Sequence, residues 1–132
     1  MLNLFPIQFL ALFAYALLRI VTGIIYITLA RRHFQSFSNL APKIQWPLIT
    51  DGRIILTLII ISESLIGGLF IIGLATQAAA IASAGLCFKL IIWHHRFPAG
   101  SIPNRLTYVL LLAISLSLLI TGAGVIAFDL PI

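Results

Sequence analysis

The sequence predicts an all-α polytopic membrane protein, an antiparallel bundle of four transmembrane helices. Of its 132 residues, 61% are hydrophobic and only 8% are charged, whereas about a quarter of the residues in a soluble domain are charged. The mean hydropathy is +1.17. A bilayer-spanning helix needs about 20 mostly apolar residues. Four such stretches account for most of the chain, so we expect a single membrane domain over residues 1–132.

The first predicted span covers residues 9–30. Within it, Ala14, Tyr15 and Ala16 have the small-x-small form of a signal-peptide cleavage site, but no Lys or Arg precedes them and the apolar stretch continues to Ala30. A cleaved signal peptide has a positively charged start and a short apolar region. We therefore expect an uncleaved first helix.

The remaining spans are predicted at residues 53–75, 77–94 and 106–128. Between the first and second spans, residues 33–47 combine polar residues and prolines with aromatic side chains, a composition too broken for a span. We expect this segment to lie along the membrane interface with Trp46 as an aromatic anchor. Because almost no residues separate the second and third spans, these two helices should be antiparallel neighbours.

The distribution of Lys and Arg predicts the orientation of the helices. Apart from Arg19 and Lys89, all Lys and Arg residues lie in or beside the loops that follow the first and third spans: Arg31, Arg32, Lys43, Arg53, Arg96 and Arg105. Cytoplasmic loops carry the excess of positive charge in membrane proteins. Both basic loops are therefore predicted to be cytoplasmic, with both chain termini outside. The net charge of +5 then reflects contacts with membrane lipids, and we expect no nucleic-acid partner.

Three charged residues, Arg19, Glu63 and Lys89, lie inside predicted spans, where an isolated charge is costly. Counted from the basic residue at the cytoplasmic end of each span, Arg19 lies about 18 Å deep and Glu63 about 15 Å deep. The matched depth and opposite charge predict an Arg19–Glu63 ion pair. Lys89 lies about 9 Å deep on the same count, so its flexible side chain can reach the interface.

Helical spacing places the polar residues on shared faces. Tyr15, Arg19 and Tyr26 lie on one side of the first helix, and Glu63 lies on the same face of the second helix as Gly67. On the third helix, a stripe of small residues lets another helix approach closely. A purely structural Arg19–Glu63 pair that fixes the helix register is an equally open interpretation. We expect these faces to converge on a polar, ligand-binding pocket lined by Tyr15, Arg19, Tyr26, Glu63 and Lys89.

No motif in the chain predicts a catalytic or metal site. P-loop, dinucleotide-binding, zinc-protease and nucleophile-elbow patterns are absent from the sequence. His33, His94 and His95 are expected to contact lipid headgroups at the cytoplasmic face rather than to ligate haem or a metal ion. Cys87 is expected to act as a small hydrophobic residue. The sequence therefore leaves open whether the protein is an enzyme.

Several short motifs occur in a recognisable order. The first helix carries Leu-Leu-Arg-Ile at 17–20 with Gly23, and the second carries Glu-Ser-Leu-Ile-Gly-Gly at 63–68, followed by Gly-Leu-Ala-Thr at 73–76. The predicted fourth helix closes with Gly-Ala-Gly at 122–124, and Asp129 follows it. In a chain of this length, this order resembles the DoxX family of small membrane proteins. The resemblance assigns motif or packing roles to Gly67, Gly68, Gly73, Gly122 and Gly124.

The resemblance implies a four-helix protein of the inner, cytoplasmic membrane, in a family named for a subunit linked to thiosulfate:quinone oxidoreduction. It implies an oxidoreductase subunit in which Arg19 and Glu63 bind a quinone-like lipophilic ligand, with no other cofactor evident. The alternative is a non-catalytic structural or assembly subunit of a larger membrane complex or homo-oligomer. Such a subunit would pack through the small residues of the third helix. A transporter is a less favoured hypothesis, because four helices leave little room for alternating access.

Overall fold

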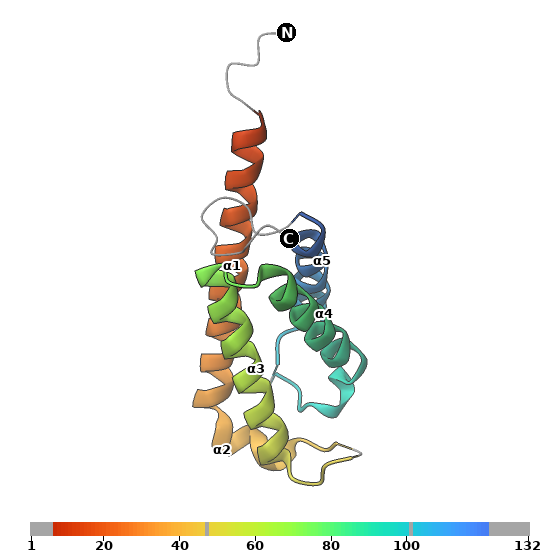
Figure 1. The fold of residues 1–132 in the computed structure, drawn as a ribbon. Helices are drawn as coiled ribbons and strands as arrows, with labels where there is room; N and C mark the ends of the chain where they lie inside the picture. Colours follow the sequence, from red (N-terminus) through yellow and green to blue (C-terminus); the bar gives the residue numbers. More distant parts are fainter. Residues whose placement is uncertain (1–6, 47, 101, 122–132) are drawn as a thin grey trace.

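The computed structural model describes residues 7–46, 48–100 and 102–121, and these residues form helices and connecting turns without a β-strand (Figure 1). The predicted all-α class is thus confirmed for this part of the chain. In order, the helices are α1 (Ile7–Gln35), α2 (Phe37–Leu40), the 3-10 helix η1 (Ala41–Lys43), α3 (Gly52–Ile72), α4 (Thr76–Ile92), the 3-10 helix η2 (His94–Arg96) and α5 (Arg105–Thr121).

Two of these helices are long and apolar enough to cross a membrane, namely α1 over Leu10–Gln35 and α3 over Gly52–Ile72. The helices α4 and α5 are apolar but shorter, with 17 residues each in the described chain. A helix of that length measures about 25 Å, which is near the lower limit for a spanning helix. The four-span topology therefore stays a prediction. The end predicted for the fourth span, together with Gly122 and Gly124, lies outside the described residues.

Two predicted helix ends are wrong. The first helix continues beyond Ala30 to Gln35, because Arg is a good helix former and the backbone ladder persists to the bond from Ser36 N–H to the Arg32 carbonyl, 3.1 Å long. The second long helix, α3, ends at Ile72 rather than at residue 75. Gly73 there adopts a left-handed conformation with φ of 74°, and its N–H bonds to the Leu69 carbonyl, which closes the helix.

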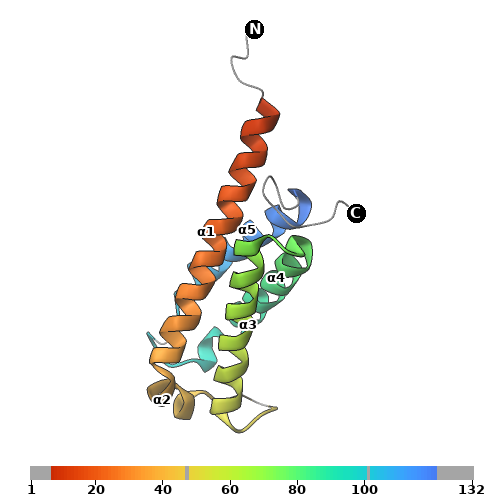
Figure 2. The same ribbon diagram turned by 60° about the vertical axis from the view of Figure 1, so that its left-hand side comes forward.

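The long helices form two pairs. α1 packs along α3, and α4 packs along α5, while α3 and α4 share a short turn and make fewer contacts with each other. Figures 1 and 2 show α3 (light green) and α4 (dark green to teal) leaving that turn as antiparallel neighbours. The predicted interfacial segment contains the last turn of α1, then α2 and η1, and η1 packs against the start of α3. Its position at a membrane interface stays a prediction.

The surface of the molecule is more apolar than that of a soluble protein, and polar groups accompany the apolar residues of its core. Large apolar side chains such as Leu17, Leu65 and Ile120 are more than half exposed. The buried residues include a set of polar and charged side chains: Arg19, Thr22, His33, Glu63, Thr76, Ser83 and Ser115. An apolar surface of this extent suits a lipid environment, and interior polar groups must then find partners within the protein.

Close approach of α1 and α3 depends on two glycines that face each other. A Cβ atom added at Gly23 would lie 2.8 Å from the Gly67 carbonyl oxygen, and one added at Gly67 would lie 2.9 Å from the Gly23 oxygen. Small residues of this kind let membrane helices gain packing energy through direct backbone contact. By contrast, nothing lies within 4 Å of a Cβ added at the neighbouring Gly68.

This contrast predicts opposite effects for two adjacent substitutions. Gly67→Ala should lower the free energy of unfolding by about 1–3 kcal/mol, because the helices must move apart to admit the methyl group. Gly68→Ala should leave it unchanged or raise it by up to about 1 kcal/mol, because alanine favours a helix. Unfolding in mixed detergent micelles, followed by circular dichroism, measures both. Equal effects of the two substitutions would contradict the α1–α3 contact.

Candidate functional site

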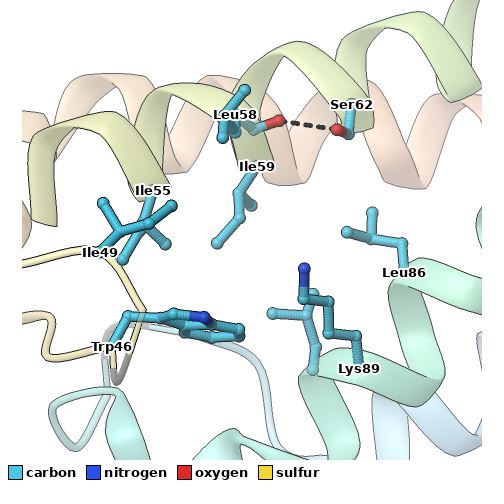
Figure 3. Close-up of a pocket in the computed structure, with 9 residues that line it drawn as sticks. Trp46, Ile49, Ile55, Leu58, Ile59, Ser62, Leu86 and Lys89 are labelled. Atoms are coloured by element: carbon cyan, nitrogen blue, oxygen red, sulfur yellow. Dashed lines mark hydrogen bonds between the residues drawn. The ribbon is translucent and has the colours of Figure 1, made fainter.

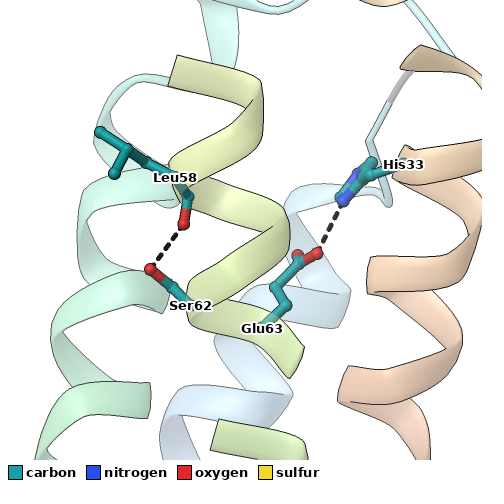
Figure 4. A network of polar contacts seen from close by, with 4 residues as sticks. All are labelled: His33, Leu58, Ser62 and Glu63. Carbon is teal, nitrogen blue, oxygen red and sulfur yellow. Dashed lines mark hydrogen bonds and ion pairs between the residues drawn. The ribbon is translucent and has the colours of Figure 1, made fainter. Parts of the chain in front are cut away.

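The buried carboxylate of Glu63 pairs with His33. His33 lies in the last turn of α1 and Glu63 lies in the middle of α3, and His33 Nδ1 is 2.8 Å from Glu63 Oε2. Figure 4 shows the two side chains pointing toward each other across the α1–α3 interface. The side chains are 2% and 0% exposed, respectively. Since a buried carboxylate needs a partner, this hydrogen-bonded pair explains how α3 tolerates an acid at this position.

One side of the Glu63 carboxylate has no hydrogen-bond partner within the described chain. Oε1 of Glu63 is buried without a partner there, and so is the hydroxyl of Tyr108 on α5. The Glu63 carboxylate acts electrostatically on Tyr108 and on Tyr26 of α1. Orphaned buried polar groups are rare in native structures and often mark functional positions. The Glu63 carboxylate is thus bonded on one side and open to further bonding on the other.

A second buried polar cluster links three helices. The Tyr26 hydroxyl lies 2.6 Å from Ser83 Oγ and 3.0 Å from Cys87 Sγ, both on α4. Ser83 Oγ in turn lies 2.5 Å from Ser115 Oγ on α5, which donates to the Leu111 carbonyl at 2.7 Å. These bonds satisfy the hydroxyl groups of Tyr26, Ser83 and Ser115 and connect the α1–α3 pair to the α4–α5 pair. The buried Cys87, predicted as a small hydrophobic residue, also belongs to this chain of hydrogen bonds.

The predicted Arg19–Glu63 ion pair is wrong in this structure. The guanidinium group of Arg19 lies against Gly73, where an added Cβ would be 2.7 Å from Arg19 Cζ. Gly73 is ten residues from Glu63, or about 15 Å along α3. The C-terminal end of a helix carries partial negative charge, so this position favours the Arg19 cation. Arg19 and Glu63 are therefore both buried against the same interface but at different levels.

The estimate that placed Arg19 and Glu63 at matching depths was wrong because it assumed an incorrect register between α1 and α3. It assumed that the first helix ends at Ala30 and that the second begins at Arg53 in the same plane of the membrane. In the structure α1 continues to Gln35, and the first turn of α3 packs against the carbonyls of Ala41 and Ile44. This offset brings Glu63 level with the last turn of α1.

The five residues expected to share one pocket are divided among separate places. Tyr26 lies near Glu63, Arg19 lies at the far end of α3, and Tyr15 is half-buried one turn before Arg19. Lys89 is exposed on α4, in a groove between α3 and α4. No single polar pocket therefore unites these five side chains.

The groove beside Lys89 is the main apolar hollow of the described chain. It consists of two adjoining cavities of about 110 and 430 Å³ that share Ser62, Leu86 and Lys89. At one end, Lys89 Nζ lies 5.1 Å from the ring centroid of Trp46, which stacks on Trp93 with ring centroids 4.4 Å apart. Figure 3 shows Lys89 pointing into this end of the groove, opposite Ile59. Among the described residues, no carboxylate pairs with Lys89.

The prediction that His33 contacts lipid headgroups is wrong, because its side chain is only 2% exposed and bonds to Glu63. The sequence nevertheless contained a signal for this position. The polar stripe of the first helix, from Tyr15 through Arg19 to Tyr26, continues at helical spacing to His33 when the helix does not stop at Ala30. Tyr108, Ser83 and Ser115 carried no comparable signal, because hydroxyl groups are common in apolar helices.

A double-mutant cycle tests the partner of Glu63. Combining His33→Leu, which cannot form the hydrogen bond, with Glu63→Gln should reveal a coupling energy above about 1 kcal/mol, because both residues share one buried hydrogen bond. Combining Arg19→Gln with Glu63→Gln should give additive effects within about 0.5 kcal/mol, because the two groups are far apart. Equilibrium unfolding in detergent supplies the free energies. Coupling of Arg19 with Glu63, and none of His33, would restore the ion pair that the sequence predicted.

Comparison with known proteins supports the motif analysis. The DoxX family model matches residues 14–96, which is more than half of the chain and includes α3 and α4 in full. A search of curated proteins and a search of solved structures each returned no significant match. The matched segment contains Arg19, His33, Glu63 and Lys89. With its apolar helices and its buried polar interior, this chain belongs to the DoxX family of membrane proteins.

Proposed function

We propose that this DoxX-type chain is a membrane subunit that binds a quinone-like amphipathic ligand in the groove between α3 and α4. The single observation behind the proposal is the ammonium group of Lys89, which points into an apolar groove and has no carboxylate partner among the described residues. An ammonium group in apolar surroundings is stabilised by a hydrogen bond to any oxygen acceptor that a ligand places beside it.

The shape of the groove suits a ligand with a polar ring and an apolar tail. The ring would lie beside Trp46 and Lys89, where an aromatic surface and a hydrogen-bond donor are adjacent. The tail would follow the larger cavity past Leu65, Leu69 and Gly85, whose walls are almost entirely apolar. Ligand pockets commonly combine apolar walls with a few polar groups in this way.

The redox chemistry itself belongs to a partner in this proposal. The chain offers a lipid-soluble electron carrier a binding site, and a partner subunit supplies the redox group that reacts with it. This division agrees with the quinone-linked role that the family resemblance implies, which is an associational argument. It differs from the sequence-based hypothesis in its site, because Lys89 replaces the Arg19–Glu63 pair as the group that holds the polar head.

A second function, as an assembly subunit, is favoured by one specific feature. Ala78, Ala82 and Gly85 form an exposed small-residue stripe on α4, and nothing lies within 4 Å of a Cβ added at Gly85. Such a stripe also suits the close approach of a helix from a partner protein. In that case a protein helix, rather than a lipid-like molecule, would occupy the groove.

Intrinsic fluorescence tests the first proposal directly, because quinones quench tryptophan and both tryptophans of the chain, Trp46 and Trp93, lie at the groove. Decyl-ubiquinone should quench the purified protein saturably in nanodiscs. Lys89→Met should weaken its binding about 10- to 100-fold, because a hydrogen bond from a charged donor contributes about 1.5–3 kcal/mol. Lys43→Met, which removes an exposed lysine of η1, should bind as the wild type does.

Filling the groove provides an independent check. Ala82→Phe places a ring in the cavity and should abolish saturable quenching, whereas Ala113→Phe on the exposed face of α5 should not. Absence of saturable quenching in the wild type would refute the ligand-binding proposal. Crosslinking of a photoreactive amino acid at Ala82 to another protein in native membranes would favour the assembly function.

A further inference from the structure

A polar cavity adjoins His33, the residue that pairs with Glu63. Its volume is about 300 Å³, and it lies between the end of α1 and the residues Gly100, Ile102 and Pro103. The walls contributed by α1 and the residue after it are mainly polar, comprising Arg32, His33, Gln35 and Ser36. A space of this size and polarity holds several water molecules, since each occupies about 30 Å³ in the liquid.

His33 therefore belongs both to the wall of this cavity and to the pair with the buried carboxylate. Its Nδ1 atom bonds to Glu63 Oε2 at 2.8 Å, and the residue also lines the cavity while its side chain is only 2% exposed. An imidazole has two nitrogens, and it can accept a proton at one while releasing a proton from the other. The geometry of a proton relay is thus present between the cavity and the interior.

The groups around Glu63 are compatible with a carboxyl group that exists both as a carboxylate and as a carboxylic acid. The titratable groups that face it are Tyr26 and His33 from α1, Cys87 from α4 and Tyr108 from α5. The guanidinium of Arg19, which would hold it as a carboxylate, lies instead against Gly73. Oε1 of Glu63 is buried without a hydrogen-bond partner in the described residues, so within that part of the chain only Oε2 of the carboxyl group takes part in a hydrogen bond.

We infer that the His33–Glu63 pair is a proton-loading site that takes up protons from the polar cavity and holds them inside the helix bundle. In the unloaded state, neutral His33 donates its Nδ1 proton to the Glu63 carboxylate. On loading, a hydronium ion in the cavity donates a proton to His33 Nε2, and the Nδ1 proton moves to Glu63 Oε2. The products are water, the opposite neutral tautomer of His33 and a carboxylic acid, so the pair has gained one proton. This site is separate from the α3–α4 groove and does not depend on its ligand.

Infrared spectroscopy of the full chain in nanodiscs tests the inference. The wild type should show the carbonyl band of a protonated carboxylic acid that grows as the bulk pH is lowered, and Glu63→Gln should lose that band. Asp51→Asn, which removes the exposed carboxylate at the start of α3, should retain it. Absence of a Glu63-dependent acid band at every accessible pH would overturn the inference.

The rate at which the band shifts after mixing with D₂O tests the route. His33→Gln retains a hydrogen bond to Glu63 but cannot relay a proton, and should slow the exchange by about 10²-fold or more. Ser36→Leu fills the cavity from its wall while leaving both members of the pair intact, and should also slow the exchange. If the exchange rate is unchanged in the Ser36→Leu protein, the cavity is ruled out as the proton source. If the exchange rate is unchanged in the His33→Gln protein, the relay through His33 is ruled out. Quinone quenching should be unaffected in these variants, so failure here is distinct from failure of the groove proposal.

Discussion

Burial of the Glu63 carboxylate is the constraint on which the rest of the interior depends. An apolar helix can carry an acid at this depth only if a neighbouring element brings a partner to it. The partner is His33, and it can reach Glu63 only because α1 continues beyond its arginines to Gln35. The contact then ties the end of α1 to the middle of α3. The 2.8 Å hydrogen bond between His33 and Glu63 therefore depends on the length of α1 and on the position of α3 along it.

Contacts at three positions along the α1–α3 interface specify the same register. At one end of α3 the Arg19 guanidinium lies against the Gly73 turn, in the middle Gly23 and Gly67 bring the two backbones together, and beyond them His33 meets Glu63. A shift of α1 by one helical turn would lose all three arrangements together. Polar contacts and close glycine packing therefore specify the same alignment, which is the consistency expected of a sequence that selects one structure.

The sequence was sufficient to predict the all-α class, the family and the interior positions of Arg19, Tyr26 and Glu63. It was insufficient to predict which of these residues meet, and the reason is geometric. Periodicity tells which residues share a face of a helix but not how far an antiparallel neighbour is displaced along its axis. The displacement of α3 relative to α1 is determined by η1 and the residue after it, because the carbonyls of Ala41 and Ile44 contact the first turn of α3. No local pattern around Arg19 or Glu63 contains that information. The position of Lys89 in a groove likewise depends on how α3 and α4 separate below their common turn.

The central claim is that Glu63 pairs with His33 rather than with Arg19. The most direct measurement is the dipolar coupling between Glu63 Cδ and the side-chain nitrogens, recorded by solid-state nuclear magnetic resonance on labelled protein in lipid bilayers. We expect a strong coupling from Glu63 Cδ to His33 Nδ1, consistent with the 2.8 Å contact, and none to the Arg19 guanidinium. A strong coupling to Arg19 in place of His33 would contradict the register and the account built on it.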